Sequence, residues 1–283
     1  MDSNKVTIKD ILSAKNKRKI TMLTAYDYPL ASVIDKAGID IILVGDSLAN
    51  VVLGLASTKE VGMTEMIHHS KAAARAVKHA LLVGDMPYES YQVENSVCVE
   101  NAQRFIKEAH CDAIKIEWFD KCLEVTDKII KAGIAVMAHI GLTPQTADKI
   151  GGFKVQGKTK ENAKLLIEQA KSLEKLGCFS IVLECIPDRI AEIITKEINI
   201  PTIGIGAGVN CDGQVLVSHD MLGLFDRYTP KFVKKYINLN EEILKAVSRY
   251  KIEVLEGKFP TKEHTFTIKE EEISKLKGCC NNH

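Results

Sequence analysis

The feature that most constrains this chain is a short apolar segment that ends in Gly-Asp-Ser. Ile41–Val44 is a run of four apolar residues, three of them β-branched, and Gly45 then lets the chain turn before Asp46 and Ser47. Such a run is typical of a strand buried on both faces, as in a parallel sheet. A carboxylate at the end of a buried strand is costly unless its charge is compensated. Asp46 therefore predicts a site at the carboxyl end of this strand.

Three further apolar runs also end in an acidic residue. Asp85 follows Leu81–Gly84, Glu117 follows Ala113–Ile116, and Glu184 follows Ser180–Leu183. In a barrel of parallel strands, the carboxyl ends of the strands carry the active site. We therefore expect the four acids to line one site at the rim of a sheet or barrel.

Segments with strand and helix patterns alternate along the chain without a break in composition. Strands are expected at 20–24, 41–44, 81–84, 113–117, 134–140, 180–184, 201–208 with its loop, and 214–219. This alternation predicts an α/β fold, a single (β/α)8 TIM barrel, with an open doubly wound sheet as the alternative. We expect one domain over residues 1–283, with a short N-terminal helix and a charged C-terminal tail at about 257–283.

The composition argues against several classes of protein. The chain carries 38 basic and 37 acidic side chains, so its formal net charge of +1 does not favour nucleic acid or an anionic membrane as a partner. The longest apolar runs have the length of strands, which argues against a transmembrane helix. The polar segment Met1–Lys5 lacks the hydrophobic region of a signal peptide. The eight Cys residues form no Cys-x-x-Cys pair and are expected to be reduced thiols. Together with the lack of a signal-peptide pattern, this leads us to expect a cytoplasmic protein.

Asp46, Asp85 and Glu117 come from three consecutive strands and form a candidate metal site. Hard oxygen ligands of this kind suit Mg²⁺, which usually keeps water and substrate oxygens among its ligands. The alternative is that each acid caps the following helix or pairs with a surface Lys. That alternative weakens for three acids at the same end of the strands, because they would repel one another without a cation between them.

Lys115, His139 and Glu184 are candidates for the remaining chemistry. Lys115 and Glu117 are two residues apart on one strand, so their side chains point to the same side. Lys115 could neutralise a bound carboxylate or form an internal ion pair. His139 could act as an acid or base or be a satisfied core histidine. Glu184, away from the acid trio in chain order, suits a general base or a helix cap ahead of Pro187.

Several ordered motifs resemble the ketopantoate hydroxymethyltransferase family. They are Val44–Leu48, Gly84–Pro87, Lys115–Glu117, His139–Gln145, Gly152–Gly157, Ile203–Gly208, Cys211–Val217 and His219-Asp220. The resemblance runs from about Lys19 to Tyr236, and its many motifs in order make it highly specific.

The resemblance implies a TIM barrel of the phosphoenolpyruvate/pyruvate-like superfamily. It also implies a Mg²⁺-dependent transfer of a hydroxymethyl group from 5,10-methylenetetrahydrofolate to 3-methyl-2-oxobutanoate, in pantothenate and coenzyme A synthesis. By the matching motifs, Asp46, Asp85 and Glu117 are the metal-associated acids, Asp46, Ser47, Asp85, Lys115 and His139 bind the ketoacid, and Glu184 is the catalytic base. Removal of the C3 proton of the ketoacid would give an enolate, which must be shielded from water. We therefore expect the loop at 151–159 to act as a lid.

The implied partners are the two small-molecule substrates and further copies of the chain. The family resemblance implies a ring-shaped homo-oligomer, often a decamer built from two pentamers. The last amphipathic helix, expected at 240–256, carries apolar residues that could dock on a neighbour or on the chain's own barrel: Ile243, Val247, Ile252 and Leu255.

Two other functions remain open from the sequence. One is a Mg²⁺-dependent lyase or mutase of 2-oxo acids, of the phosphoenolpyruvate mutase and isocitrate lyase type, although the lyase motif Lys-x-Cys-Gly-His is absent from this sequence. The other is a barrel that only binds ligands or serves as a scaffold. The set of acids with Lys115 argues against a scaffold, since charges at the barrel rim serve no purpose there.

Overall fold

The computed structural model describes residues 4–92, 97–147 and 152–280. Its parallel strands form a closed barrel in which each strand pairs with the next and the eighth pairs with the first. The strands are β1 Ile20–Thr24, β2 Ile41–Val44, β3 Leu81–Asp85, β4 Ala113–Glu117, β5 Val136–Gly141, β6 Ser180–Glu184, β7 Thr202–Ile205 and β8 Gly213–Leu216. The predicted (β/α)8 barrel is confirmed, and the open sheet is excluded.

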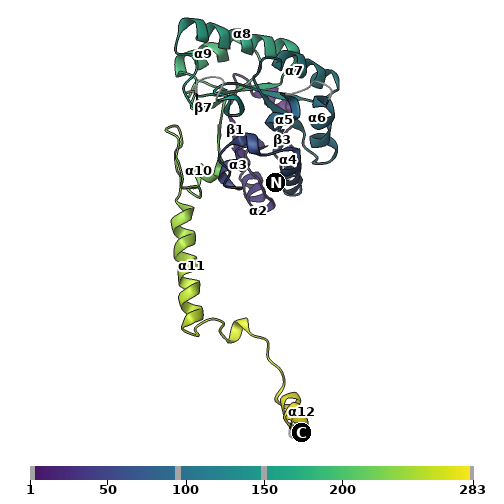
Figure 1. Ribbon diagram of the computed structural model, residues 1–283, viewed down its shortest axis with the longest axis vertical. Coiled ribbons are helices and arrows are strands. Elements are labelled where there is room, and N and C mark those ends of the chain that lie inside the picture. The colour runs from purple at the N-terminus through teal and green to yellow at the C-terminus, as the bar shows by residue number, and fades with distance from the viewer. Residues whose placement is uncertain (1–3, 93–96, 148–151, 281–283) are drawn as a thin grey trace. The chain divides into compact units, whose positions relative to one another are not determined.

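Helices follow the strands and surround the barrel (Figure 1). In the first part of the chain they are α1 Ile8–Ala14, α2 Tyr28–Lys36, α3 Leu48–Val51, the 3-10 helix η1 Thr58–Glu60, α4 Met63–Ala74, α5 Tyr88–Tyr91, α6 Cys98–Lys107 and α7 Cys122–Lys131. They continue with η2 Pro144–Thr146, α8 Lys160–Leu176, α9 Asp188–Glu197 and α10 Ser218–Met221. After Tyr236 the chain also forms α11 Leu239–Leu255, η3 Lys262–His264 and α12 Glu270–Cys280. Within the described ranges, no helix combines the length and the apolar character needed to cross a membrane.

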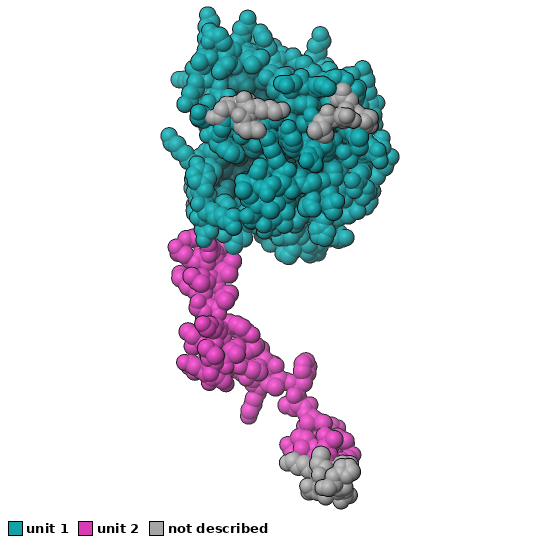
Figure 2. Space-filling model, viewed as in Figure 1, with its two compact units in different colours: residues 1–236 teal, residues 237–283 magenta. Residues whose placement is uncertain are grey.

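The chain divides into two compact units, Met1–Tyr236 and Ile237–His283 (Figure 2). The first unit contains the barrel, and the second contains α11, η3 and α12. We predicted only a charged tail at about 257–283, and the structure adds two helical segments there. A single domain over the whole chain stays a prediction.

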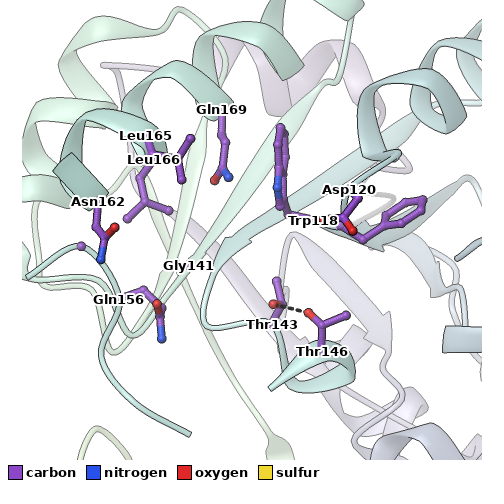
Figure 3. A pocket seen from close by; sticks show the side chains of 12 residues that line it. Trp118, Asp120, Gly141, Thr143, Thr146, Gln156, Asn162, Leu165, Leu166 and Gln169 are labelled. Carbon is purple, nitrogen blue, oxygen red and sulfur yellow. Dashed lines mark hydrogen bonds between the residues drawn. The ribbon is translucent and has the colours of Figure 1, made fainter. Parts of the chain in front are cut away.

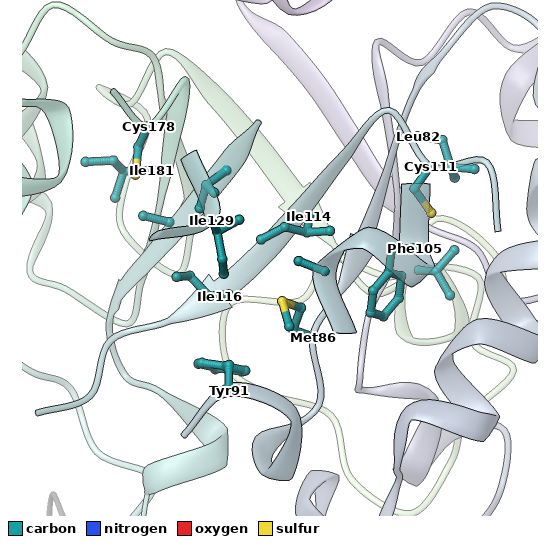
Figure 4. Close-up of a cluster of buried hydrophobic side chains, with 14 of the residues drawn as sticks. Leu82, Met86, Tyr91, Phe105, Cys111, Ile114, Ile116, Ile129, Cys178 and Ile181 are labelled. Atoms are coloured by element: carbon teal, nitrogen blue, oxygen red, sulfur yellow. The ribbon is translucent and has the colours of Figure 1, made fainter. Parts of the chain in front are cut away.

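The barrel wall separates two apolar clusters, because successive side chains of a strand point to opposite faces. On the outer face, Ile114 and Ile116 of β4 pack with Phe105 of α6 and Ile129 of α7 (Figure 4). On the inner face, the cluster contains Ala113 of β4 together with side chains of the other strands. The residues two and four positions after Ala113 therefore also face the barrel interior, which is where the polar side chains gather.

Helix α1 closes the amino-terminal end of the barrel. Its buried side chains Ile11 and Ala14 belong to the inner cluster, with Ile20, Leu81 and Phe179. An apolar helix at this end leaves the carboxyl ends of the strands as the end that can carry a polar site.

Two predicted elements end earlier than expected. The sequence from Thr64 to His79 predicts one long helix, but α4 ends at Ala74. The reason is the buried carboxylate of Asp35, which accepts hydrogen bonds from the backbone N–H groups of residues 78, 79 and 80 and thereby directs the chain into β3. The eighth strand, expected to run to His219, ends at Leu216, and His219 lies on α10.

A buried ion pair fixes α1 to the last strands. Lys15 Nζ lies 2.7 Å from Asp212 Oδ2 and also donates to the backbone oxygen of Thr195, and the two charged side chains are only 8% and 6% exposed. Asp212 also accepts the backbone N–H of Thr202. Removing one partner of such a pair leaves an uncompensated buried charge.

We therefore expect Lys15→Met to lower the free energy of unfolding by about 3 kcal/mol or more, measured by urea titration. Lys9→Met, at an exposed position of the same helix, should change it by about 0.5 kcal/mol or less. Equal stability of the two variants would contradict an energetic role for the pair.

Candidate active site at the carboxyl end of the barrel

The strand register brings four predicted site residues together. Asp85 lies opposite Lys115 in the β3–β4 pairing, and Glu117 lies opposite His139 in the β4–β5 pairing. All four side chains are buried. The site follows from the two-residue period of β4, which places Lys115 and Glu117 on the inner face with Ala113.

Lys115 is the cation at the centre of this group. Its Nζ lies 2.8 Å from Asp85 Oδ1 and 3.9 Å from Glu117 Oε1. Burial acts to lower the pKa of Lys115, but the carboxylates of Asp85, Glu117 and Asp46 outweigh it and raise that pKa above its ordinary value. Lys115 therefore remains an ammonium group inside the barrel.

The charged form of the neighbouring aspartates is disfavoured. Burial raises the pKa of Asp85 to about 7, even though Lys115 opposes the shift. Burial, followed by the charge of Glu117, also raises the pKa of Asp46. Both carboxylates would hold their charge more readily with a further cation beside them.

His139 links the acids of β4 and β6. Its Nδ1 lies 3.5 Å from Glu117 Oε1, and its Nε2 lies 3.3 Å from Glu184 Oε2. Burial and Lys115 act to lower the pKa of His139, but the two carboxylates outweigh them and raise it to about 9. Although β6 lies across the barrel from β2, Glu184 is thus connected through His139 and Glu117 to Lys115.

The end of β2 adds Asp46 and Ser47. The backbone N–H of Asp46 donates to Asp85 Oδ2 at 3.1 Å, which joins β2 to the charged group. Ser47 instead contacts Tyr26, with 2.8 Å between the two hydroxyl oxygens. The structure therefore connects six of the seven predicted residues directly and places Ser47 on the adjoining turn.

Three residues of this region were not identified from the sequence as site residues. Tyr26 contacts Ser47, while Gln145 and Tyr91, both buried, hydrogen-bond to each other beside Asp46 and Glu117. Gln145 could have been found from its place in the motif that follows the His139 strand, and Tyr26 from its place just after the first strand. Tyr91 lies on a short helix and carries no comparable signal.

The carboxylates fit a cation that takes several ligands from elsewhere. Among the residues that the structure describes, no group of three or more His, Cys, Asp or Glu side chains could hold a metal ion. Asp46 and Asp85 nevertheless offer hard oxygen donors, although Asp85 Oδ1 already lies 2.8 Å from the ammonium group of Lys115. Mg²⁺ is commonly held by one or two carboxylates together with water and substrate oxygens.

A cavity of about 340 Å³ lies between the loops that follow β4 and β5 and helix α8, and its lining includes none of the seven predicted site residues (Figure 3). Its walls include Trp118, which directly follows Glu117, the loop residues Thr143 and Thr146, and Leu166 of α8. Gly141 also lines it and adopts a φ of +100°, and a Cβ there would collide with the backbone oxygen of Glu184. A glycine is therefore required where β5 passes the end of β6.

The predicted lid at 151–159 can be followed only in part, because Gly151 lies outside the described residues. Gln156 donates its backbone N–H to the oxygen of Cys185, next to Glu184, and both Gln156 and Gly157 line the cavity. Phe153 is exposed. A lid function for this loop stays a prediction.

The chain matches one protein family over most of its length. A family model described as ketopantoate hydroxymethyltransferase matches residues 5–262. The 3-methyl-2-oxobutanoate hydroxymethyltransferase of Syntrophomonas wolfei is 56% identical over 93% of this chain and 95% of the relative. The proteins of that name from Syntrophobacter fumaroxidans and Enterococcus faecalis are 54% and 53% identical, over 97% and 98% of this chain and 98% and 100% of the relatives.

Solved structures with low sequence identity share the fold. A phosphonopyruvate hydrolase superposes with a TM-score of 0.60 at 12% identity, over 97% of this chain and 95% of that chain. A 2,3-dimethylmalate lyase, described as a member of the PEP mutase/isocitrate lyase superfamily, has a TM-score of 0.60 at 11% identity, over 98% of this chain and 96% of that chain. At these identities the likeness shows the fold alone.

The charge balance at Lys115 can be tested without any ligand. Lys115→Met should lower the free energy of unfolding by about 3 kcal/mol or more, because it leaves buried carboxylates without their cation. Adding Asp85→Asn should recover part of the loss. Urea unfolding at pH 8 with a chelator measures both effects, and Lys107→Met, at an exposed position on α6, is the control. A single variant as stable as the parent would show that Lys115 does not compensate these acids.

Proposed function

Because the chain belongs to the ketopantoate hydroxymethyltransferase family, we propose that it transfers a hydroxymethyl group from 5,10-methylenetetrahydrofolate to 3-methyl-2-oxobutanoate. The product is 2-dehydropantoate, a precursor of pantothenate and coenzyme A. The observation that carries the proposal is the connected charged group that runs from Asp85 through Lys115, Glu117 and His139 to Glu184. This group offers a cation for the substrate carboxylate and a carboxylate for its C3 proton.

We propose that Asp46 and Asp85 would hold Mg²⁺, with Glu117 as the third acid nearby. Their oxygen donors and raised pKa values fit a cation at this position. When bound, Mg²⁺ supplies a Lewis acid that stabilises negative charge on the keto oxygen of the substrate.

The side chains of this chain then have distinct roles. Glu184, which is 15% exposed, removes the C3 proton as the general base. Lys115 and Ser47 bind the ketoacid. His139, whose pKa is raised to about 9, is an imidazolium near neutral pH that lies between Glu117 and Glu184 and can donate a hydrogen bond to the substrate. The nucleophilic C3 left after proton removal attacks the methylene carbon of the folate after one of its two C–N bonds has broken, and the released nitrogen takes up the proton. Water then displaces the second folate nitrogen, which gives the hydroxymethyl group of the product and tetrahydrofolate.

The alternative, a lyase or mutase acting on 2-oxo acids, would use the same carboxylates and ammonium group. Its support is the shared fold with structures such as the 2,3-dimethylmalate lyase. No contact among the described residues favours it over hydroxymethyl transfer. The cytoplasmic location also remains a prediction.

The decisive experiment follows the C3 proton of 3-methyl-2-oxobutanoate by NMR in deuterated water. The parent protein should exchange this proton in a Mg²⁺-dependent manner without folate. Glu184→Gln keeps the shape of the side chain and removes its basicity, so exchange should slow on the order of 10²-fold or more, while calorimetry still detects Mg²⁺-dependent ketoacid binding.

Glu168→Gln provides the matched control, because Glu168 is 59% exposed on α8. A parent protein without Mg²⁺-dependent exchange would refute the proposed function. A Glu184→Gln variant that exchanges at the parental rate would refute the assignment of the base only.

We also propose that the chain forms a homo-oligomer, which the family resemblance implies to be a decamer of two pentamers. Among its described side chains, α11 has no buried residue. At 100° per residue, Ile243, Val247, Tyr250 and Val254 share one face, whereas Ile252, grouped with Ile243 in the sequence analysis, points to the opposite side. A helix that is apolar around much of its circumference is usually covered by other protein.

Sedimentation velocity at micromolar concentration should therefore show an oligomer. Val247→Glu should shift it toward smaller species, because it places a charge in the apolar face. Ala246→Glu adds the same charge one position away, on the side of the helix that carries Glu242, Arg249 and Glu253, and should have less effect. A monomeric parent protein would overturn the proposal.

A further inference from the structure

Gln145 is a buried neutral residue that touches two of the acids in the charged group. It lies on η2 and has no exposed surface. Its side-chain Nε2 donates to Asp46 Oδ2 at 2.9 Å, and its backbone N–H donates to Glu117 Oε2 at 3.0 Å. One residue on the loop after β5 therefore binds acids that follow β2 and end β4.

The orientation of the Gln145 amide is fixed by its other neighbours. The hydroxyl of Tyr91 accepts the backbone N–H of Glu117 at 2.9 Å, so its own proton is available for Gln145 Oε1, 2.6 Å away. Gln92 Nε2 donates to the same Oε1 at 3.0 Å. The nitrogen must then face the two acceptors on the other side, Asp46 Oδ2 and the backbone oxygen of Met86 at 3.0 Å.

This network satisfies the Gln145 side chain completely. A primary amide has two N–H donors and an oxygen with two acceptor positions, and each finds a partner here. Fully satisfied buried networks hold their members in one arrangement. The carboxylates of Asp46 and Glu117 are therefore set by the loop after β5 as well as by their own strands.

We propose that Gln145 is a positioning residue that fixes the Asp46 carboxylate, and its spacing from Glu117, for binding a divalent cation together with the ketoacid. The inference rests on the proposed function and extends it to a residue that contacts the acids and has no charge of its own. Groups that hydrogen-bond to metal ligands orient them, and replacing such groups typically weakens metal binding by about 10- to 100-fold.

Two variants separate the contacts. Gln145→Met has a similar length and lacks all four hydrogen bonds of the amide, while its backbone N–H to Glu117 remains. Tyr91→Phe keeps Gln145 and its bond to Asp46 but removes the hydroxyl that donates to the amide oxygen and accepts the backbone N–H of Glu117. Gln103→Met, on α6 where the amide oxygen accepts from Lys107 at the surface, is the matched control.

The main readout is binding, measured with Mn²⁺ as a paramagnetic stand-in for Mg²⁺. The EPR signal of free Mn²⁺ is titrated against protein in the presence of 3-methyl-2-oxobutanoate. Gln145→Met should weaken Mn²⁺ binding by about tenfold or more, Tyr91→Phe should weaken it to a smaller extent, and the control should match the parent. Urea unfolding of each variant with a chelator reports stability separately.

The outcomes distinguish positioning from support of the fold. A purely structural residue would lower the free energy of unfolding and leave the Mn²⁺ affinity of the folded protein unchanged, which would overturn the proposal. If Gln145→Met does not fold, Tyr91→Phe decides, and parental Mn²⁺ affinity in that variant would also overturn it. A parent protein without Mg²⁺-dependent C3 exchange would instead refute the proposed function, which keeps the two failures apart.

Discussion

The site depends on one buried ammonium group placed among carboxylates. Lys115 lies 2.8 Å from Asp85 and 3.9 Å from Glu117 inside the barrel. Desolvation of each ion costs several kcal/mol in a protein interior, and only close opposite charges and hydrogen bonds offset that cost. The acids outnumber the cations at this end of the barrel, and burial, with a smaller contribution from neighbouring acids, raises the pKa values of Asp46 and Asp85. Such an excess of acids is a property expected of a site that binds another cation.

The barrel makes this arrangement possible by separating its two ends. The inner apolar cluster and helix α1 fill the amino-terminal end, while the inward positions near the carboxyl ends of β3 to β6 are polar. Register then decides which polar side chains meet, since a shift of one residue in β4 would turn Lys115 and Glu117 outward. The apolar packing between strands and helices thus fixes the register on which the charged group depends.

The sequence predicted those parts of the site that local patterns determine. Apolar runs ending in Asp46, Asp85, Glu117 and Glu184 were sufficient to expect a barrel with acids at one end. The contacts of Gln145 could not be predicted, because they join a loop to two strands and a short helix that are distant in sequence. The same holds for the end of α4, which depends on the Asp35 carboxylate accepting N–H groups from another part of the chain. Local periodicity carries no information on such long-range hydrogen bonds.

The contact between His139 and Glu184 changes how the base is understood. From strand order alone, Glu184 was expected to act apart from the acids of β2 to β4. In the structure, its Oε2 lies 3.3 Å from His139 Nε2, and the other nitrogen of that ring lies 3.5 Å from Glu117. A proton that arrives at Glu184 therefore lies beside the His139 ring, whose other nitrogen is close to Glu117. Because the charges of Glu184, His139 and Glu117 interact, a substitution at one of these residues is expected to alter the electrostatics of the other two.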